Sequence, residues 1–307
     1  MRELVIISGK GGTGKTSLTA AFAALAATDT QGGRSILCDA DVDAADLHLL
    51  MQPDIRQTTD FMGGSKAQIN PDLCTGCGTC LPLCRFGAIN ERFEVDPIRC
   101  EGCGVCVDFC PVQAIDFPVQ RCGEWYISDT RFGPMVHARL GIAEENSGKL
   151  VSLVRKEVRQ LAETSGRDLI IIDGPPGIGC PVIAAIGGAT ALIIVVEPTV
   201  SGIHDMERVI DLAAHFRVPG MVVVNKFDLN VEMTESIEAL AQKRNVALLG
   251  RVHFDPFFTQ SLVAGKTLFE FGGETPTHQL VREIWTNIIN SPSMNPLGIV
   301  DFKATIQ

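Results

Sequence analysis

The sequence predicts an α/β protein with a doubly wound, mostly parallel sheet, into which a small α+β domain is inserted. Three observations support this prediction. Near the start of the chain, a short apolar run is followed by a glycine-rich loop and an alanine-rich helical pattern. Further apolar runs alternate with helical patterns over most of the remaining chain, as they do in parallel sheets. Between residues 66 and 118 this alternation stops, and eight cysteines follow one another at short intervals.

The composition indicates a soluble, globular chain. Its 307 residues are enough for one large α/β domain and a small extra module. A net charge of -10 disfavours nucleic acid and anionic membranes as partners. No apolar run reaches the roughly 18 residues of a membrane span, and no basic leader precedes the first strand, so we expect a cytoplasmic protein. Eleven cysteines in such a chain indicate metal chemistry rather than disulfides.

Residues 8–16 have the sequence Ser-Gly-Lys-Gly-Gly-Thr-Gly-Lys-Thr, which is a phosphate-binding loop pattern. A strand at residues 4–7 precedes it and a helix at 17–28 follows it, which is the context that such a loop requires. Glycines let the backbone close around a polyphosphate with its N–H groups turned toward the anion. Lys15 supplies charge to the outer phosphates, and the Thr16 hydroxyl can bind Mg²⁺. The expected nucleotide contacts are Gly11, Gly12, Thr13, Gly14, Lys15, Thr16 and Ser17.

Acidic residues follow two predicted apolar strands. One strand ends at Asp39, which is followed by Asp41, Asp43 and Asp46, and another ends at Asp173, which is followed by Gly-Pro-Pro-Gly. The carboxyl ends of parallel strands are where an α/β sheet binds its ligands. Capping of the next helix by Asp41 or Asp43 is an alternative. Both roles are compatible, because Asp43 or Asp46 can cap while Asp39 and Asp41 face the phosphates.

The cysteine ladder repeats one spacing. Residues 74–84 follow the pattern C-x2-C-x2-C-x3-C, and residues 100–110 repeat it. This is the pattern of two-cluster bacterial ferredoxins, in which three closely spaced thiolates bind one [4Fe-4S] cluster and the fourth binds the other. Zinc is the competing interpretation, but it takes four ligands at looser spacing. We assign one cluster to Cys74, Cys77, Cys80 and Cys110, and the other to Cys100, Cys103, Cys106 and Cys84.

The repeat extends beyond the cysteines, because Phe-Gly-Ala-Ile at 86–89 corresponds to Val-Gln-Ala-Ile at 112–115. We therefore expect a ferredoxin-like inserted domain at residues 66–118. The flanking segments 1–65 and 119–307 would form the nucleotide-binding domain. The insertion follows shortly after the acidic segment that ends the second strand, so the clusters would be attached near residues that respond to the nucleotide.

A second lysine, Lys10, stands before the glycine pair of the loop. Gly-Lys-Gly-Gly-x-Gly-Lys-Thr resembles the deviant Walker A loop of the MinD/Mrp/ParA group of P-loop NTPases, which includes the nitrogenase iron protein. The resemblance implies a homodimeric Mg²⁺-dependent ATPase in which Lys10 reaches the partner's phosphates. It also implies that Asp39 and Asp173 help to bind Mg²⁺, that Asp41 orients the attacking water, and that the Gly174 N–H meets the γ-phosphate.

The segment Asn-Lys-Phe-Asp at 225–228 ends another predicted strand. It matches the motif with which GTPases recognise guanine through its aspartate, Asp228. In MinD-type proteins the same strand end supplies an asparagine, here Asn225, to adenine. The motif alone leaves both bases open, but Lys10 favours ATP and ADP. His253 stands where relatives commonly carry proline beside the base.

Cys180 lies seven residues after Asp173, the offset of an interface cluster cysteine in the nitrogenase iron protein. The second cysteine that such a cluster needs, upstream within 140–150, is absent. Two roles stay open for Cys180, a structural or transient redox role and a metal site at the subunit interface. Cys38 is expected to be a small buried strand residue. The tail 291–307 lacks the basic amphipathic pattern that anchors the cell-division member of the group to membranes.

These observations predict an ATPase that carries two [4Fe-4S] clusters. Its output would be electron transfer to a redox or metallocluster partner protein, such as a paralogous ATPase, or assembly of a metal–sulfur cluster on that partner. An alternative is a positioning or scaffold ATPase in which the clusters sense redox state or are structural. A protein that only carried electrons would need no ATPase loop.

Overall fold

The computed structural model describes residues 1–28, 35–141 and 146–295, and it divides into two compact units. The described parts of 1–58, 126–138 and 148–307 form the first unit, and those of 59–125 and 139–147 form the second. The chain enters the second unit along β3 (Asp54–Ser65) and leaves it along β6 (Val119–Thr130). The second unit therefore includes residues on both sides of the expected 66–118 segment.

A nine-stranded sheet has the order β11-β10-β9-β1-β8-β2-β7-β6-β3. Every adjacent pair from β11 to β7 is parallel, which confirms the mostly parallel sheet. The order reverses around β1, so that β8 and β2 lie on one side of it and β9 and β10 on the other. The remaining strands are β1 (Arg2–Ser8), β2 (Ser35–Asp39), β7 (Gly133–Leu140), β8 (Leu169–Pro176), β9 (Ala191–Val196), β10 (Gly220–Asn225) and β11 (Ala247–Val252).

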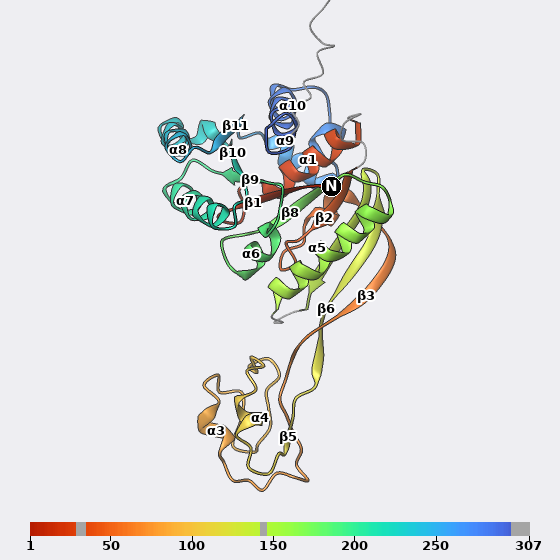
Figure 1. Ribbon diagram of the computed structural model, residues 1–307, viewed down its shortest axis with the longest axis vertical. Helices are drawn as coiled ribbons and strands as arrows, with labels where there is room; N and C mark the ends of the chain where they lie inside the picture. The colour runs from red at the N-terminus through yellow and green to blue at the C-terminus, as the bar shows by residue number, and fades with distance from the viewer. Residues whose placement is uncertain (29–34, 142–145, 296–307) are drawn as a thin grey trace, which may run out of the picture. The chain divides into compact units, whose positions relative to one another are not determined.

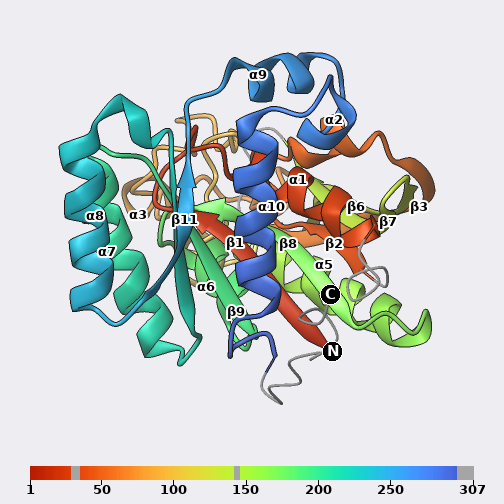
Figure 2. The same cartoon turned by 90° about the horizontal axis from the view of Figure 1, so that it is seen from above.

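Helices cover both faces of the sheet in the first unit, as Figures 1 and 2 show. One face carries α1 (Lys15–Thr28) and α10 (Pro276–Ile289), whose Phe22 and Trp285 rings stack 5.7 Å apart. The other face carries α5 (Ser147–Thr164), α6 (Cys180–Ile186) and α7 (Val200–His215), with α8 (Val231–Lys243) beside α7. Covering by helices on both faces explains why β1 and β8 are buried at nearly every position and why each contains four consecutive aliphatic residues.

The short elements lie in the connections. They include α2 (Leu47–Met51), α9 (Pro256–Val263) and the 3₁₀ turns η1 (Phe227–Leu229) and η2 (Leu268–Glu270). Within the ranges 1–28, 35–141 and 146–295, none of the helices combines the length and the hydrophobicity that crossing a bilayer requires. The expectation for the tail concerns mainly residues 296–307, which lie outside the described residues.

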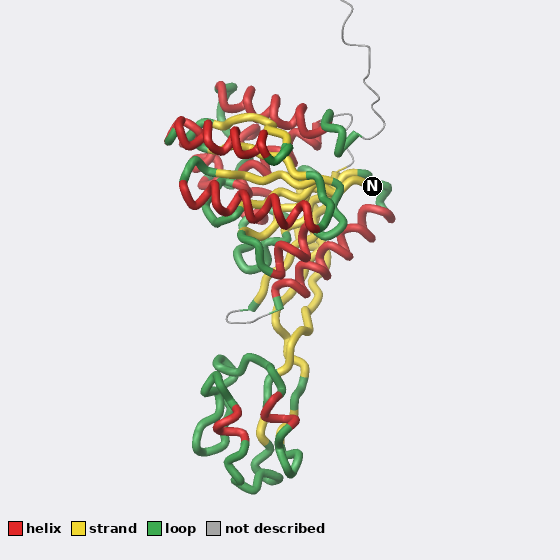
Figure 3. The backbone as a smooth tube through the Cα atoms, turned by 60° about the vertical axis from the view of Figure 1, so that its left-hand side comes forward, coloured by secondary structure: helices red, strands yellow, loops and turns green. Residues whose placement is uncertain are grey.

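The second unit consists mostly of loops (Figure 3), with the two-residue strands β4 (Gln68–Ile69) and β5 (Ile115–Asp116) paired antiparallel. Its two short helices, α3 (Cys80–Leu83) and α4 (Val105–Asp108), occupy corresponding positions in the two cysteine repeats. The repeat is visible in the backbone, because Gly87 and Gln113 both have positive φ, 61° and 53°. The Ala-Ile pairs that follow them, at 88–89 and 114–115, are buried.

Several predicted boundaries agree with the structure, and others need correction. The strands at 35–39 and 191–196, the helix at 147–164 and the complete burial of Cys38 are confirmed. The helix after the loop begins at Lys15 rather than at residue 17. The strand expected to end at Asp173 continues to Pro176, because Pro176 pairs with Ser8 of β1 across a register shift.

Candidate functional site

The glycine loop joins the carboxyl end of β1 to the first turn of α1. Gly12 and Gly14 have φ angles of 81° and 88°, which favour glycine. A Cβ atom on Gly14 would lie 2.3 Å from Asn225 Nδ2, so a side chain at that position would displace the asparagine. Asn225 donates from Nδ2 to the Thr13 carbonyl at 2.7 Å. The loop conformation is therefore held by a residue at the end of β10.

Lys15 meets the carboxylates of two other strand ends. Its Nζ lies 2.9 Å from Asp173 Oδ1 and 3.3 Å from Asp41 Oδ2. Burial alone would lower the pKa of Lys15, but the charges of Asp173 and Asp41 outweigh burial and raise it. The Thr16 hydroxyl donates to Asp173 Oδ2 at 2.7 Å. The structure thus brings together Lys15, Thr16 and Asp173, which the sequence assigned to phosphate and Mg²⁺ binding, and Asp41, which the resemblance assigned to the attacking water.

Asp39 lies beside this group and is completely buried. Its oxygens accept from the Asp41 N–H at 3.1 Å and from the Leu47 N–H at 3.2 Å. The start of α2 is therefore capped by Asp39, whereas Asp46 at the N-cap position makes no side-chain cap bond and neither Asp41 nor Asp43 supplies one. Burial, together with the charge of Asp173, raises the pKa of Asp39 well above its usual range.

Three carboxylates, those of Asp39, Asp41 and Asp173, therefore share one ammonium group, that of Lys15. Burial and the charge of Asp173 also raise the pKa of Asp41, although Lys15 opposes this shift. Uncompensated buried negative charge is costly and favours a further cation. The Thr16 hydroxyl and the Asp173 carboxylate, 2.7 Å apart, are oxygen donors of the kind that Mg²⁺ takes together with phosphate oxygens, so this pair fits that ion.

Thr19 belongs to this site although the sequence analysis did not single it out. Its hydroxyl lies 3.1 Å from Asp173 Oδ1 and 2.9 Å from the Lys15 carbonyl. Thr19 is one helical turn after Lys15, on the same face of α1, and this spacing is the signal that could have identified it.

Lys10 lies against its own chain. Its Nζ is 3.2 Å from Glu197 Oε2 and 3.3 Å from Thr199 Oγ1, both of which follow β9. Glu197 also pairs through Oε1 with Lys226, and Lys226 donates to the Gly12 carbonyl at 2.9 Å. Lys226 and Glu197 are further site residues that the sequence analysis did not assign.

A cavity of about 180 Å³ opens beside the loop, next to Gly12, Gly14 and Ser17. Asn225 and His253 also border it, and the His253 ring lies 4.5 Å from the Phe227 ring. Asp228 does not line this cavity. Its Oδ1 accepts from the Phe254 N–H at 2.6 Å, so it supports the cavity wall.

Gly174 lies inside β8, where a Cβ atom would come within 2.6 Å of Ile7 Cγ2 and 3.0 Å of the Ile6 carbonyl oxygen. Glycine is therefore required by the close approach of β8 and β1. Gly177, three residues later, donates to the Ser8 carbonyl at 2.8 Å, which brings this loop beside the start of the glycine loop.

The cysteines of the first expected cluster border a common cavity in the second unit. Its lining includes Cys74, Cys77 and Cys80 from the first repeat and Cys110 from the second. Burial raises the pKa of Cys80, and the charges of the other three cysteines raise it further. The Thr79 hydroxyl lowers the pKa of Cys77 by hydrogen bonding to its sulfur, at 3.4 Å.

The cysteines of the second expected cluster are also neighbours. Burial raises the pKa of Cys106, and the charges of Cys100, Cys103 and Cys84 add to this shift. The two sets are related by the repeat, since the Ala88 N–H donates to Cys84 Sγ and the Ala114 N–H donates to Cys110 Sγ, both at 3.3 Å. Each fourth cysteine therefore lies with the three cysteines of the opposite repeat.

In the described part of the chain, no three His, Cys, Asp or Glu side chains converge closely enough to hold one metal ion. A [4Fe-4S] cluster needs one set of four thiols, and these lie further apart than the ligands of a single metal ion because they surround a cubane. The chain provides two such sets. Backbone N–H groups directed at the sulfurs would also stabilise thiolates. The cysteine sets therefore fit [4Fe-4S] clusters.

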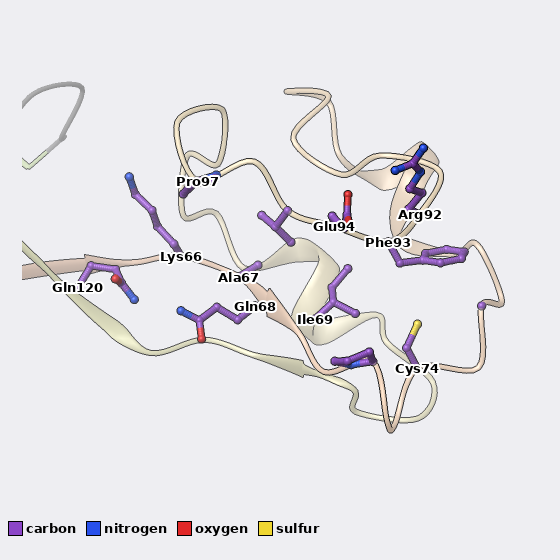
Figure 4. Close-up of a pocket in the computed structure, with 13 residues that line it drawn as sticks. Lys66, Ala67, Gln68, Ile69, Cys74, Arg92, Phe93, Glu94, Pro97 and Gln120 are labelled. Atoms are coloured by element: carbon purple, nitrogen blue, oxygen red, sulfur yellow. The ribbon is translucent and has the colours of Figure 1, made fainter.

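A larger cavity of about 610 Å³ lies beside the first cysteine set. Figure 4 shows Lys66, Gln68 and Gln120 at one end and Cys74 beside Phe93 at the other. Through this cavity, the first cysteine set is accessible from the side of Cys74 within the second unit.

Cys180 is exposed at the first residue of α6. A Cβ atom on Gly148, in the first turn of α5, would lie 3.3 Å from Cys180 Cβ, so the two helix starts are close. Among the described residues, Cys180 belongs to no group of three or more side chains that could hold a metal ion.

Comparisons with known proteins agree with this architecture. Residues 4–268 match the family model of the CobQ/CobB/MinD/ParA nucleotide-binding domain. An uncharacterised protein of Methanocaldococcus jannaschii is 34% identical over 229 residues, which cover 74% of this chain and 79% of that protein. A cytosolic Fe-S cluster assembly factor NUBP2 homolog of Trichoplax adhaerens is 29% identical over 139 residues, which cover 40% of this chain and 52% of the homolog.

Solved structures show the same fold. The MinD cell division protein of Aquifex aeolicus matches with a TM-score of 0.58 and 20% identity, over 95% of this chain and 98% of MinD. MinD complexed with Mg-ADP from Pyrococcus horikoshii matches with a TM-score of 0.58 and 17% identity, over 94% of this chain and 95% of that one.

Proposed function

Because the chain belongs to the CobQ/CobB/MinD/ParA nucleotide-binding family, we propose that it is a Mg²⁺-dependent ATPase that also carries two [4Fe-4S] clusters. ATP binding closes a homodimer, and this closure is coupled to electron transfer, or to metal–sulfur cluster assembly, on a partner protein. The name of the NUBP2 homolog, an Fe-S cluster assembly factor, supports an output in iron–sulfur chemistry.

The nucleotide half of the proposal rests on the groups around Lys15. The loop amides and Lys15 would hold the phosphates, while Thr16, Asp39 and Asp173 would hold Mg²⁺, which neutralises phosphate charge when bound. Asp41 would orient the attacking water, and Lys10 of each protomer would contact the phosphates bound to the other. Catalysis of this kind depends on positioning and electrostatics.

The observation that carries the proposal is the exchange of the fourth cysteine between the two repeats. Cys110 lies with the first set and Cys84 with the second, as in the two-cluster ferredoxin pattern. Each set would hold one cluster, which supplies one-electron redox chemistry when bound. A chain that combines these sets with a nucleotide loop has the parts needed to link ATP binding to iron–sulfur chemistry.

The test is a comparison of wild-type protein with Lys15→Met, both prepared anaerobically. Wild-type protein is expected to contain about eight iron and eight sulfide atoms per chain and to hydrolyse ATP with Mg²⁺. Lys15→Met should keep the iron and lose ATPase activity by about 100-fold or more, because a transition-state charge partner is removed.

Lys149→Met is the matched control, because Lys149 is an exposed residue of α5. It should keep both iron content and activity. Wild-type protein without iron, or Lys15→Met with unchanged hydrolysis, would contradict the proposal.

A further inference from the structure

The carboxylate of Glu197 binds two lysines of the nucleotide site, one with each oxygen. Oε2 lies 3.2 Å from Lys10 Nζ, and Oε1 pairs with Lys226. The Glu197 side chain is 14% exposed, whereas Lys10 is 33% exposed and Lys226 is 24% exposed. A largely buried acid thus holds two more accessible cations in place.

We propose that Glu197 is a positioning residue that keeps Lys10 on its own chain until the dimer closes. This inference rests on the proposed function, in which Lys10 reaches the phosphates bound to the partner subunit. A lysine bonded to Glu197 and Thr199 in its own chain is not available for that contact. Closure must therefore exchange Glu197 and Thr199 for phosphate oxygens as the partners of Lys10.

The second cation bound to Glu197, Lys226, explains how Lys10 can leave Glu197 when the dimer closes. If Lys10 were the sole partner of Glu197, its departure would leave a largely buried carboxylate unpaired, which is costly. Lys226 remains paired with Glu197 and also donates to the Gly12 carbonyl at 2.9 Å. Glu197 therefore keeps one cation throughout, and the release of Lys10 breaks one partly exposed ion pair.

The arrangement predicts that Glu197 opposes dimer formation. Glu197→Gln removes the negative charge and replaces one of the two oxygens, which face different lysines, by an amide NH₂ group that cannot accept. Lys226 keeps the Gly12 carbonyl as an acceptor at 2.9 Å, whereas Lys10 keeps only the Thr199 hydroxyl at 3.3 Å, so Lys10 is held less firmly on its own chain. A partly exposed ion pair contributes about 0.5–1 kcal/mol, and a symmetric dimer breaks two of them, so the dimer should become about fivefold to thirtyfold tighter.

The experiment measures the dimer dissociation constant by analytical ultracentrifugation, using the iron-loaded chain of 307 residues with Mg²⁺ and a non-hydrolysable ATP analogue. Glu197→Gln should dimerise more tightly than the wild type. Glu274→Gln is the control, because Glu274 forms an exposed ion pair with Arg282 at the start of α10. It should dimerise like the wild type. Glu197→Asp, whose shorter side chain reaches less far, should give a smaller change in the same direction.

A double-mutant cycle with Lys10→Met separates positioning from a general structural effect. On the Lys10→Met background, Glu197→Gln should no longer change the dimer dissociation constant, because its effect acts through Lys10. A wild-type dimer that Glu197→Gln leaves unchanged or weakens would overturn this inference alone. A wild-type chain that forms no dimer with the analogue would overturn the proposed function and the inference with it.

Discussion

The two units hold their ligand-binding residues in different ways. In the first unit, Lys15 at the start of α1 and Asp39 and Asp173 in the central strands β2 and β8 are buried, and they already bond to one another or to the backbone. In the second unit, the eight cysteines of the two sets are partly or fully exposed and lie mainly on loops. A large apolar core holds the residues of the nucleotide site in place, whereas only a small core and loops hold the cysteines in place.

This contrast indicates that the two units depend on their ligands to different degrees. The first unit has buried apolar residues on both faces of a long sheet, so we expect it to fold without nucleotide. The second unit has two-residue strands, two four-residue helices and a small core. Small domains of this kind usually need metals or disulfides for stability, so cluster binding should contribute much of the folding free energy of the second unit.

The largest expected effect therefore comes from removing the clusters. Removal of iron with a chelator should abolish amide hydrogen-exchange protection throughout residues 66–118 while leaving that of β1, β8 and β9 nearly unchanged. Cys110→Ser should remove about four iron atoms per chain and lower protection in both repeats, because Cys110 lies with the cysteines of the first repeat. The measurements are iron analysis and hydrogen exchange by mass spectrometry.

Cys180→Ser is the control for this experiment, since Cys180 belongs to neither cysteine set. It should keep the wild-type iron content in the monomer. If residues 66–118 of the iron-free chain stayed protected from hydrogen exchange, the second unit would not depend on its clusters for stability, and the proposed contrast between the units would be wrong.

An intermediate effect concerns acid stability of the first unit. Burial, with a smaller effect of His48, lowers the pKa of His137 to about 4. The His137 ring forms a hydrogen bond of 2.9 Å with the Ser128 hydroxyl and stacks on the Tyr126 ring. The unfolded chain binds a proton at this residue below about pH 6.5 and the folded chain does not, so this group makes the folded state less stable as pH falls.

The linkage predicts that His137 accounts for a loss of about 1.4 kcal/mol in the free energy of unfolding between pH 7.5 and pH 5.5. His137→Asn should remove that part of the pH dependence, as measured by denaturant unfolding followed by circular dichroism. His215→Asn changes an exposed histidine of α7 and should retain the wild-type slope. Equal slopes in His137→Asn and the wild type would contradict this prediction, because they would show that folding does not lower the pKa of His137.

The smallest expected effect concerns base recognition. Asp228 bonds to the Phe254 N–H and does not line the cavity beside the loop. Asp228→Asn keeps an acceptor oxygen, so ATP affinity should change by less than about threefold. A guanine site that used Asp228 would lose about 100-fold in GTP affinity on this substitution. Titration of fluorescent ATP and GTP analogues distinguishes the two outcomes.

Local sequence was sufficient for the central strands and the loop. The segments 35–39 and 191–196 are apolar on both faces, and such strands can be recognised without knowing their neighbours. The glycine loop likewise depends on residues close in sequence. The spacing of the four cysteines in each repeat is typical of two-cluster ferredoxins. The exchange of Cys84 and Cys110 between the repeats could therefore be predicted from that spacing.

Features that depend on distant strand ends could not be predicted in the same way. The first part of β3 is almost entirely exposed, so no apolar run indicated a long strand there. The pairing of Glu197 with Lys10 and Lys226 requires the ends of β1, β9 and β10 to meet, and it follows from the strand order rather than from any local pattern. The capping of α2 by Asp39 joins residues only eight positions apart, but it depends on the conformation of the connection from β2 to α2, which no local pattern indicates.

The measurement that tests the account most directly is the reduction potential of both clusters in one anaerobic preparation, with ADP and with a non-hydrolysable ATP analogue, each with Mg²⁺. Coupling between the nucleotide site and the clusters predicts that at least one potential shifts by about 30 mV or more, which is about 0.7 kcal/mol for one electron. Two clusters whose potentials are the same in both nucleotide states would contradict the proposed coupling.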